Sequence, residues 1–257
     1  MNSPANLATL GRVFYGGSIA AMGVLTMIYR DVPYMLLPPN HAWLTEHVVA
    51  VYVVGALLLV AGVAIVAGRR IAAVSVVLGT ALLLIFCFYF LPYELTGSRN
   101  YRLFGDWENA AKELALAGGA FVLAGNYQRR AVRLGAVLFA LTIISFGIDH
   151  FLYARQAADY IPAWIPNHLF WMYPTGAVLL CSGLAILLSI RVRLFATLLG
   201  SMIFIWVLIL HIPRALAERL GDGGGEVISL LLALAYCGTA WWIAGSKKGL
   251  YSYKSYL

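Results

Sequence analysis

The chain has 257 residues, of which 62% are hydrophobic and 11% charged, with a mean hydropathy of +0.83 and a net charge of +7. Soluble domains contain roughly 45–50% apolar and about 25% charged residues, so this composition excludes an ordinary soluble protein. The basic residues lie in short segments between apolar runs, a pattern that indicates membrane topology and excludes a nucleic-acid-binding stripe.

Apolar runs of about 18 to 22 residues recur along the chain, and each matches the ~20 residues that a helix needs to cross a ~30 Å hydrocarbon core. The sequence therefore predicts an all-α, polytopic membrane protein with eight spans. In chain order these are Arg12–Tyr29, His47–Ala67, Ile71–Pro92, Glu108–Gly125, Leu134–Tyr153, His168–Ile190, Leu194–Ile212 and Val227–Ala244.

Charge is distributed unequally between the two sides of this predicted topology. The termini and the even-numbered loops carry eleven of the 18 basic residues, whereas the other side carries seven basic residues, all eleven acidic residues and all five histidines. By the positive-inside rule, both termini are expected to be cytoplasmic and the acidic loops to face outward. The expected location is a bacterial inner membrane, with the polar chemistry on its periplasmic side.

The chain also resembles itself at an offset of about 121 to 124 residues. The matches include Gly11 with Gly135, Gly23 with Gly147, His47 with His168, Gly55 with Gly176, Gly62 with Gly183, Arg70 with Arg191 and Pro92 with Pro213. Each unit contains an even number of predicted spans, so both copies enter and leave on one side, as in a parallel repeat. We predict two tandem four-helix repeats, residues 1–127 and 128–257.

The second repeat is the more polar one at its outer helix ends. His150 falls opposite Thr26 and His211 opposite Phe90, and the candidate site residues lie at the ends or starts of the fifth, sixth and seventh spans. Ionisable groups near hydrocarbon are costly and are functional candidates by default. The candidate ligand-binding residues are Asp149, His150, Trp164, His168, Trp171, Tyr173, His211 and Arg214.

Three interpretations of this group remain open. The side chains can simply anchor helix ends in the headgroup layer, as interfacial aromatic and basic residues often do. They can form a pocket for a polar head such as a quinone carbonyl or a lipid headgroup, with aromatic walls. Alternatively, His150, His168 and His211 can bind a metal ion or a haem, with Asp149 as a ligand or supporting group. No compact metal-binding motif is present.

Several segments resemble the DoxX-like superfamily of four-helix membrane proteins. They are the helix-ending His150-Phe151, the Ile-Pro-Ala-Trp-Ile-Pro loop at 161–166, Gly176 and Gly183 in the following helix, and the basic turn at Arg191. The resemblance spans most of residues 133–244 and is fainter over residues 10–125, so the whole looks like two fused modules. Members include the membrane subunit of a thiosulfate:quinone oxidoreductase, which implies a quinone-facing role.

The sequence thus favours a DoxX-like protein that binds a quinone or lipid-like ligand within a respiratory or redox assembly. Membrane lipid and protein subunits of a complex are the expected partners, and quinone is the expected cofactor, with haem or a metal ion as alternatives. Two other functions stay open: a non-catalytic scaffold subunit and a transporter of a small solute or lipid. Whether the protein is an enzyme is not determined by the sequence.

Overall fold

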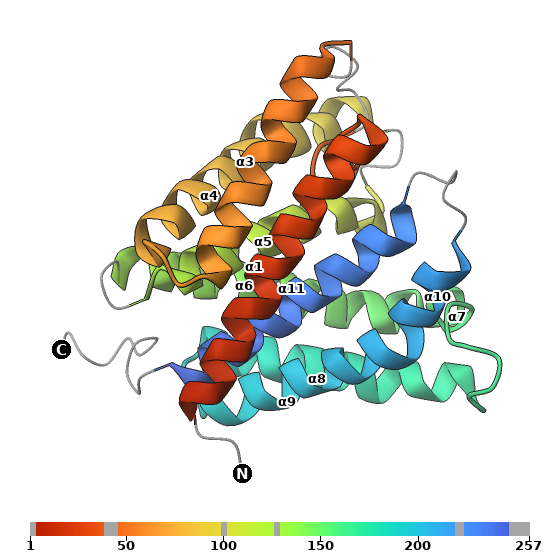
Figure 1. Ribbon diagram of the computed structural model, residues 1–257. Helices are drawn as coiled ribbons and strands as arrows, with labels where there is room; N and C mark the ends of the chain where they lie inside the picture. Colours follow the sequence, from red (N-terminus) through yellow and green to blue (C-terminus); the bar gives the residue numbers. More distant parts are fainter. Residues whose placement is uncertain (1–3, 39–45, 99–101, 126–128, 219–223, 247–257) are drawn as a thin grey trace.

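A computed structural model describes residues 4–38, 46–98, 102–125, 129–218 and 224–246, and this part of the chain is helical without strands (Figure 1). The longer helices are α1 (Pro4–Tyr29), α3 (Val48–Val66), α4 (Ile71–Ile85), α5 (Glu108–Leu123), α6 (Arg129–Leu152), α8 (His168–Leu187), α9 (Val192–Trp206) and α11 (Gly225–Gly245). The short elements are η1 (Phe86–Phe90), η2 (Tyr93–Gly97), η3 (Phe104–Trp107), α7 (Ala154–Ala158), η5 (Val207–His211) and α10 (Ile212–Ala217).

Seven of the eight predicted spans are long and apolar enough to cross a membrane. Helix α4 continues through η1 and η2 as one helix of 27 residues, and α9 continues through η5 and α10 as one of 26 residues. The exception is α5, which has 16 residues and is therefore about 24 Å long, shorter than a ~30 Å hydrocarbon core. The chain is a multi-pass membrane protein with seven candidate spans among its described residues.

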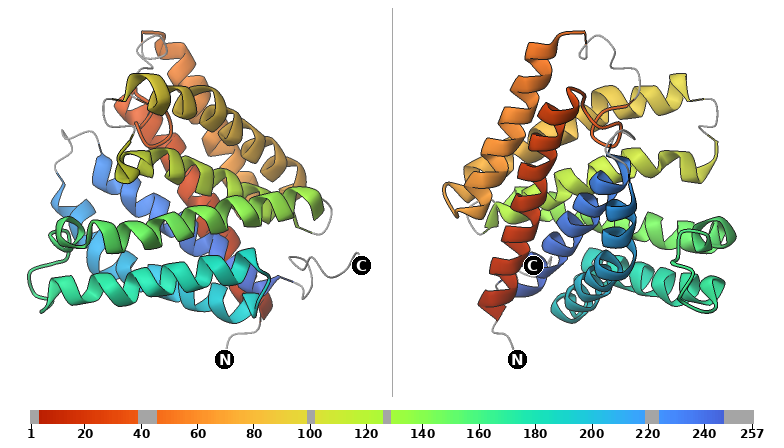
Figure 2. Two further views of the ribbon diagram at one scale, coloured as in Figure 1. Left: turned by 180° about the vertical axis from the view of Figure 1, so that it is seen from behind. Right: turned by 45° about the vertical axis from the view of Figure 1, so that its right-hand side comes forward.

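The long helices pack as a closed ring of neighbours. Each packs against the next in the order α1, α3, α4, α5, α6, α8, α9 and α11, and α11 returns to α1. Helix α5 also packs against α11 across the ring, and Figures 1 and 2 show α11 running beside α1 through the centre of the molecule. The two predicted repeats are therefore joined through extensive helix packing instead of standing apart as independent bundles.

Helix contacts in one half have counterparts in the other half. The neighbour pairs α1–α3, α3–α4, α4–α5 and α1–α11 correspond to α6–α8, α8–α9, α9–α11 and α6–α5. Close approaches follow the same correspondence, 120 to 124 residues apart: Gly11 meets Gly238 where Gly135 meets Gly118, and Gly79 meets the Phe121 ring where Gly200 meets the Trp241 ring. Glycine permits such approaches because it lacks a Cβ atom.

Each half also contains a π-helical segment, a local widening of the helix, and the two segments lie at corresponding positions. The segments η1 and η5 are π-helical and lie 121 residues apart, and each ends two residues before a proline, Pro92 or Pro213. Proline has no N–H and its ring clashes with the carbonyl four residues earlier, which disrupts the regular hydrogen-bond ladder. In the second half this widened turn carries His211.

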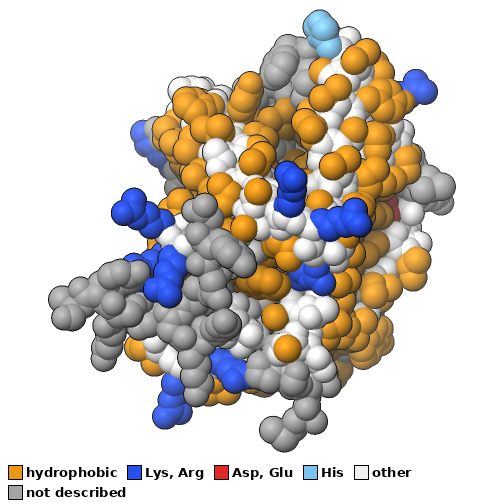
Figure 3. Space-filling view, turned by 60° about the vertical axis from the view of Figure 1, so that its left-hand side comes forward, with side chains coloured by type: hydrophobic (Ala, Val, Ile, Leu, Met, Phe, Trp, Pro, Cys, Tyr) orange, Lys and Arg blue, Asp and Glu red, His pale blue; other side chains and the backbone are white. Residues whose placement is uncertain are grey.

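The outside of the molecule is apolar, as contact with lipid requires. Helices α3 and α4 expose large side chains such as Val49, Leu57, Val60 and Val77, each at least 65% exposed. Figure 3 shows Lys and Arg side chains scattered over a largely hydrophobic face, with an acidic side chain visible only near one edge. Burial of the polar backbone inside helices and exposure of aliphatic side chains indicate that membrane lipid surrounds these helices.

Candidate functional site

A cavity of about 770 Å³ is lined mainly by residues of the second half of the chain. Helices α6, α8, α9 and α11 form its walls, together with η5 and α10, and the first turns of α5 close one side. Tyr34 and Met35, from the segment after α1, also line it. A cavity of this size lies within the ~300–1,000 Å³ range of small-molecule sites.

The cavity extends along the helix axes from the outer helix ends toward the membrane interior. On α6 its lining residues include Ile143, Phe146 and Asp149, which follow helical spacing on one face, and Tyr153 follows at the helix end. The ten residue steps from Ile143 to Tyr153 correspond to a depth of about 15 Å at 1.5 Å per step. The inner part is therefore apolar and the outer part polar.

Helices α9 and α11 show the same change from apolar inner residues to polar outer residues. Helix α9 and its continuation supply Met202, Ile203, Trp206 and Leu210 to the inner wall before His211 and Arg214 appear at the outer end. Helix α11 runs the other way, from Glu226 and Ser229 at the outer end to Leu232 and Ala233 further in. Facing helices thus change from polar to apolar in the same direction, which builds an amphipathic cavity.

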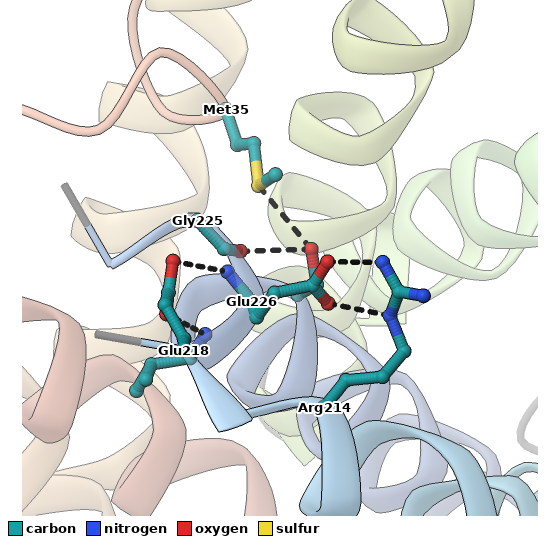
Figure 4. A network of polar contacts seen from close by, with 7 residues as sticks. Met35, Arg214, Glu218, Gly225 and Glu226 are labelled. Carbon is teal, nitrogen blue, oxygen red and sulfur yellow. Dashed lines mark hydrogen bonds and ion pairs between the residues drawn. The ribbon is translucent and has the colours of Figure 1, made fainter. Parts of the chain in front are cut away.

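An ion pair holds the outer end of α11 against α10. The Arg214 guanidinium donates hydrogen bonds to both carboxylate oxygens of Glu226, through Nε at 2.9 Å and through a terminal nitrogen (Figure 4). The side chains remain about one-third exposed, and the Arg214 guanidinium also lies 4.7 Å from the centre of the Tyr160 ring. This geometry fixes Arg214 as a donor at the cavity mouth.

Glu218 completes the network by capping α11. Its carboxylate accepts hydrogen bonds from the backbone N–H groups of Glu226 (3.1 Å) and Val227 (3.2 Å), near the start of that helix (Figure 4). Those N–H groups have no acceptor within the helix, and a negative charge is favourable at a helix N-terminus. The cap therefore positions Glu226 beside Arg214.

A second polar group lies across the mouth on α5. Lys112 Nζ is 2.8 Å from a carboxylate oxygen of Glu108 and donates to the side-chain oxygen of Asn109 at 3.3 Å. Asp149 lines the same side, and its Oδ1 atom is buried without a hydrogen-bond partner among the described residues. Asp149 therefore retains acceptor capacity at the cavity mouth.

The overall charge of the cavity is weakly acidic. Its described lining contains four carboxyl residues, Glu108, Asp149, Glu218 and Glu226, but only two cations, Lys112 and Arg214. Both cations already pair with carboxylates. The pKa of the Tyr34 phenol is raised, mainly by burial and further by the negative charges of Glu108 and Glu226 at the cavity mouth. Tyr34 is therefore a protonated, neutral hydrogen-bond donor, and the site disfavours an anionic head.

Two of the three candidate histidines line this cavity. His150 Nδ1 lies 2.7 Å from the Phe146 carbonyl oxygen. Because that oxygen can only accept, Nδ1 must carry the hydrogen, and Nε2 of the neutral ring is then an acceptor. His211 lies on η5 and lines the cavity between Leu210 and Arg214.

The other candidate residues lie away from the cavity. His168 Nε2 is 3.1 Å from the Pro162 carbonyl, and the Trp171 indole donates to the Pro166 carbonyl at 3.1 Å. Trp164 is 69% exposed, and Tyr173 packs against Phe151 on the outer surface. Asp149, His150, His211 and Arg214 are therefore brought to one cavity, whereas the other four candidates are not among its lining residues.

The three-histidine metal site, one of the three interpretations left open, is not formed by the described residues. His168 is held by the turn that precedes α8, apart from the cavity that His150 and His211 line. No three His, Cys, Asp or Glu side chains among the described residues are grouped closely enough to hold a metal ion. The site consists instead of two histidines among hydrogen-bonding and apolar side chains.

Several cavity residues were missed by sequence reasoning. Glu218 and Glu226 lie between the seventh and eighth predicted spans, and Lys112 and Tyr236 lie within predicted spans. A usable signal was present in α5, since Glu108, Lys112 and Glu113 interrupt an otherwise apolar run. Charges in a membrane helix point toward protein or a water-filled cavity.

Comparisons with known proteins give no relative for this chain. No protein-family model, curated protein or solved structure matches it. The class that the fold and cavity define is a multi-pass helical membrane protein with an amphipathic cavity at one end of its helices.

Proposed function

We propose that the protein binds an amphiphilic, membrane-soluble ligand with an uncharged polar head, a quinone or a similar lipid, in the cavity of its second half. The observation that carries this proposal is the change from apolar to polar walls over a depth of about 15 Å. A hydrophobic tail or ring fits beside Phe146, Met202 and Trp206, and a carbonyl or hydroxyl fits among the hydrogen-bonding groups at the mouth.

The charge distribution supports a neutral head over a phosphate. Arg214 and Lys112 are already paired, and the remaining carboxyl at Asp149 repels an anion. Carbonyl oxygens of a quinone can accept from Tyr34 or from an N–H group of Arg214, and its hydroxyl form can donate to Asp149 or His150 Nε2. The site therefore offers partners to both the oxidised and the reduced form.

The wider setting that we propose is a bacterial inner-membrane, DoxX-like protein made of two duplicated four-helix repeats, with α5 as an eighth, shorter span and both termini cytoplasmic. The paired helix contacts and the two π-helical segments support duplication. In this arrangement the cavity mouth faces the periplasm and serves a respiratory or redox assembly.

Trp206 provides a direct test because its indole lines the cavity. The purified protein in lipid nanodiscs is titrated with a short-chain quinone while tryptophan fluorescence is recorded, and extracted lipids are identified by mass spectrometry. We expect saturable quenching that Trp206→Phe reduces and Trp171→Phe, outside the cavity, leaves intact. Quenching that is linear in quinone, or identical in both variants, would contradict the proposal.

A non-catalytic scaffold is the second candidate, because aromatic side chains are unusually exposed around the start of α8. Trp164, Phe170, Trp171 and Tyr173 are between 40% and 69% exposed. Such side chains are enriched in protein interfaces and at membrane surfaces. A preparation without bound quinone or lipid, but with a stoichiometric partner chain that is lost in a Trp164→Ala/Phe170→Ala variant, would favour the scaffold.

A further inference from the structure

One carboxyl residue of the described chain is completely buried and is not part of the cavity lining. Glu113, in the middle of α5, has no exposed surface, and neither of its carboxyl oxygens has a hydrogen-bond partner among the described residues. Sequence reasoning grouped it with the acidic residues of the outer loops. The structure instead places it inside the helix ring, one residue after Lys112, which lines the cavity.

The neighbouring phenols do not neutralise Glu113. Tyr15 and Tyr236 both interact electrostatically with it, but each donates its hydroxyl hydrogen to a backbone carbonyl of α5, Tyr15 to Leu116 at 2.7 Å and Tyr236 to Lys112 at 3.0 Å. These bonds hold both phenol rings against α5. Their oxygens keep lone pairs that can accept a hydrogen bond.

Among the described residues, no cation is paired with Glu113 either. Lys112 is engaged with Glu108 and Asn109. Helix α4 contains no titratable residue, and α6 contains none between Arg133 and Asp149. The remaining titratable residues of segments packed on α5 are Cys87 and Tyr89 of η1, Asp106 of η3, Arg129, Arg130, Arg133, Asp149 and His150 of α6, and Glu226, Tyr236 and Cys237 of α11.

An ionised carboxylate without a partner in an apolar interior costs several kcal/mol, so such a group must hold a proton or a cation. A metal ion needs several oxygen or nitrogen ligands, and the described residues offer no such cluster around Glu113. A proton needs only the carboxyl group itself. The surroundings of Glu113 are therefore suited to a proton.

Tyr236 connects this carboxyl group with the cavity. It lines the cavity wall and lies between the rings of Phe139 and Phe146, with centroid distances of 6.5 and 6.1 Å. Tyr15, on the α1 side, is fully buried and is not among the cavity-lining residues. Tyr236, which interacts with Glu113, and Lys112, its neighbour in the chain, therefore form the part of the cavity wall that adjoins Glu113.

We propose that Glu113 is a proton-binding site buried behind the cavity, and that it exchanges its proton with the cavity through the wall at Tyr236. This role does not depend on which ligand occupies the cavity. Protons enter from the polar mouth and reach Glu113 when the Tyr236 hydroxyl turns from the Lys112 carbonyl: the phenol gives its own hydrogen to the carboxylate while its oxygen takes another from the cavity side.

Labelling of the wild-type chain tests the site without any variant. The full-length protein in phosphatidylcholine nanodiscs is treated with dicyclohexylcarbodiimide, which enters hydrocarbon and reacts with protonated carboxyl groups, and its peptides are mapped by mass spectrometry. We expect an adduct at Glu113, and we expect Glu113→Gln to lose it while adducts on α6 and α11 are unchanged. Adducts confined to the cavity-mouth carboxyls would overturn the proposal.

Infrared spectroscopy tests the exchange route. The carbonyl stretch of a protonated, unpaired carboxyl group is expected in the wild type and lost in Glu113→Gln. After transfer to D₂O, Tyr236→Phe should slow the isotope shift of that band, whereas Tyr15→Phe, which removes the other phenol, should not. Equal exchange in the two variants, or a band unchanged by Glu113→Gln, would refute the proposal, and neither result depends on quinone binding.

Discussion

The crossing of α1 and α11 gives a sharp test of the packing. A Cβ atom added at Gly238 would lie 2.6 Å from the Gly11 carbonyl oxygen and 2.7 Å from the Tyr15 nitrogen, both backbone atoms. Ordinary contact begins at 3.4 Å, so Gly238→Ala must separate the two helices by about 0.8 Å. Overpacking of this kind costs about 1–3 kcal/mol.

Gly17 supplies the matched control on the facing helix. A Cβ atom there meets nothing within 4 Å, so Gly17→Ala keeps the packing and gains up to about 1 kcal/mol of helix propensity. Unfolding in mixed micelles of increasing denaturing-detergent fraction, followed by tryptophan fluorescence, measures both variants. We expect Gly238→Ala to lower the free energy of unfolding and Gly17→Ala to maintain or raise it.

The same contact predicts strong coupling between the two glycines. In a Gly11→Ala/Gly238→Ala double variant, both added methyl groups enter one crossing, so the loss should differ from the sum of the single losses. If Gly238→Ala were as stable as Gly17→Ala, the close approach of α1 and α11 would be wrong, and so would the ring of helices that depends on it.

Three further predictions concern the cavity and use the quinone titration or the same unfolding assay. His211→Phe copies the buried Phe90 of the first half and should abolish saturable quinone binding while leaving stability nearly unchanged; unaltered binding would exclude the cavity. Glu226→Gln removes the charge that pairs with Arg214 and should cost about 1–2 kcal/mol, between surface and buried pairs, so an unchanged free energy of unfolding would contradict the pairing. Trp164→Ala, on an exposed side chain, should leave quinone affinity unchanged, and a large loss would move the site toward α8.

Membrane-spanning helices could be predicted from the sequence because each one depends on the length and hydrophobicity of a single continuous segment. These properties are local, so seven predicted spans correspond to helices long enough to cross a membrane. Helix α5 was predicted as an ordinary span because its run of small apolar residues looks lipid-soluble. In the structure nearly all of those residues are buried against other helices, and the helix is shorter than a span.

The site was predicted in part for a similar reason. Asp149 and His150 lie at the end of the apolar run of α6, and His211 and Arg214 lie at the end of the run of α9, so span length alone brings them to one depth. The Nε2 atom of His168 forms a local hydrogen bond with the Pro162 carbonyl in the preceding turn. The hydrophobic periodicity of the sequence cannot predict this hydrogen bond. The pairing of Arg214 with Glu226 depends on a glycine-rich connection and on how α11 returns to α10, which requires three-dimensional information.

Comparison of the two halves explains why only one carries this polar site. At the place of His150, the first half has Thr26, whose hydroxyl is buried and donates back to the Met22 carbonyl at 2.9 Å. At the place of His211 it has Phe90, the last residue of the π-helical segment η1, whose side chain is 1% exposed. The first half thus satisfies its polar group within one helix and packs its widened turn with an aromatic ring. In the second half His150 also bonds within its own helix, through Nδ1 to the Phe146 carbonyl, but it and His211 line a cavity whose walls also hold charged residues of α5, α10 and α11.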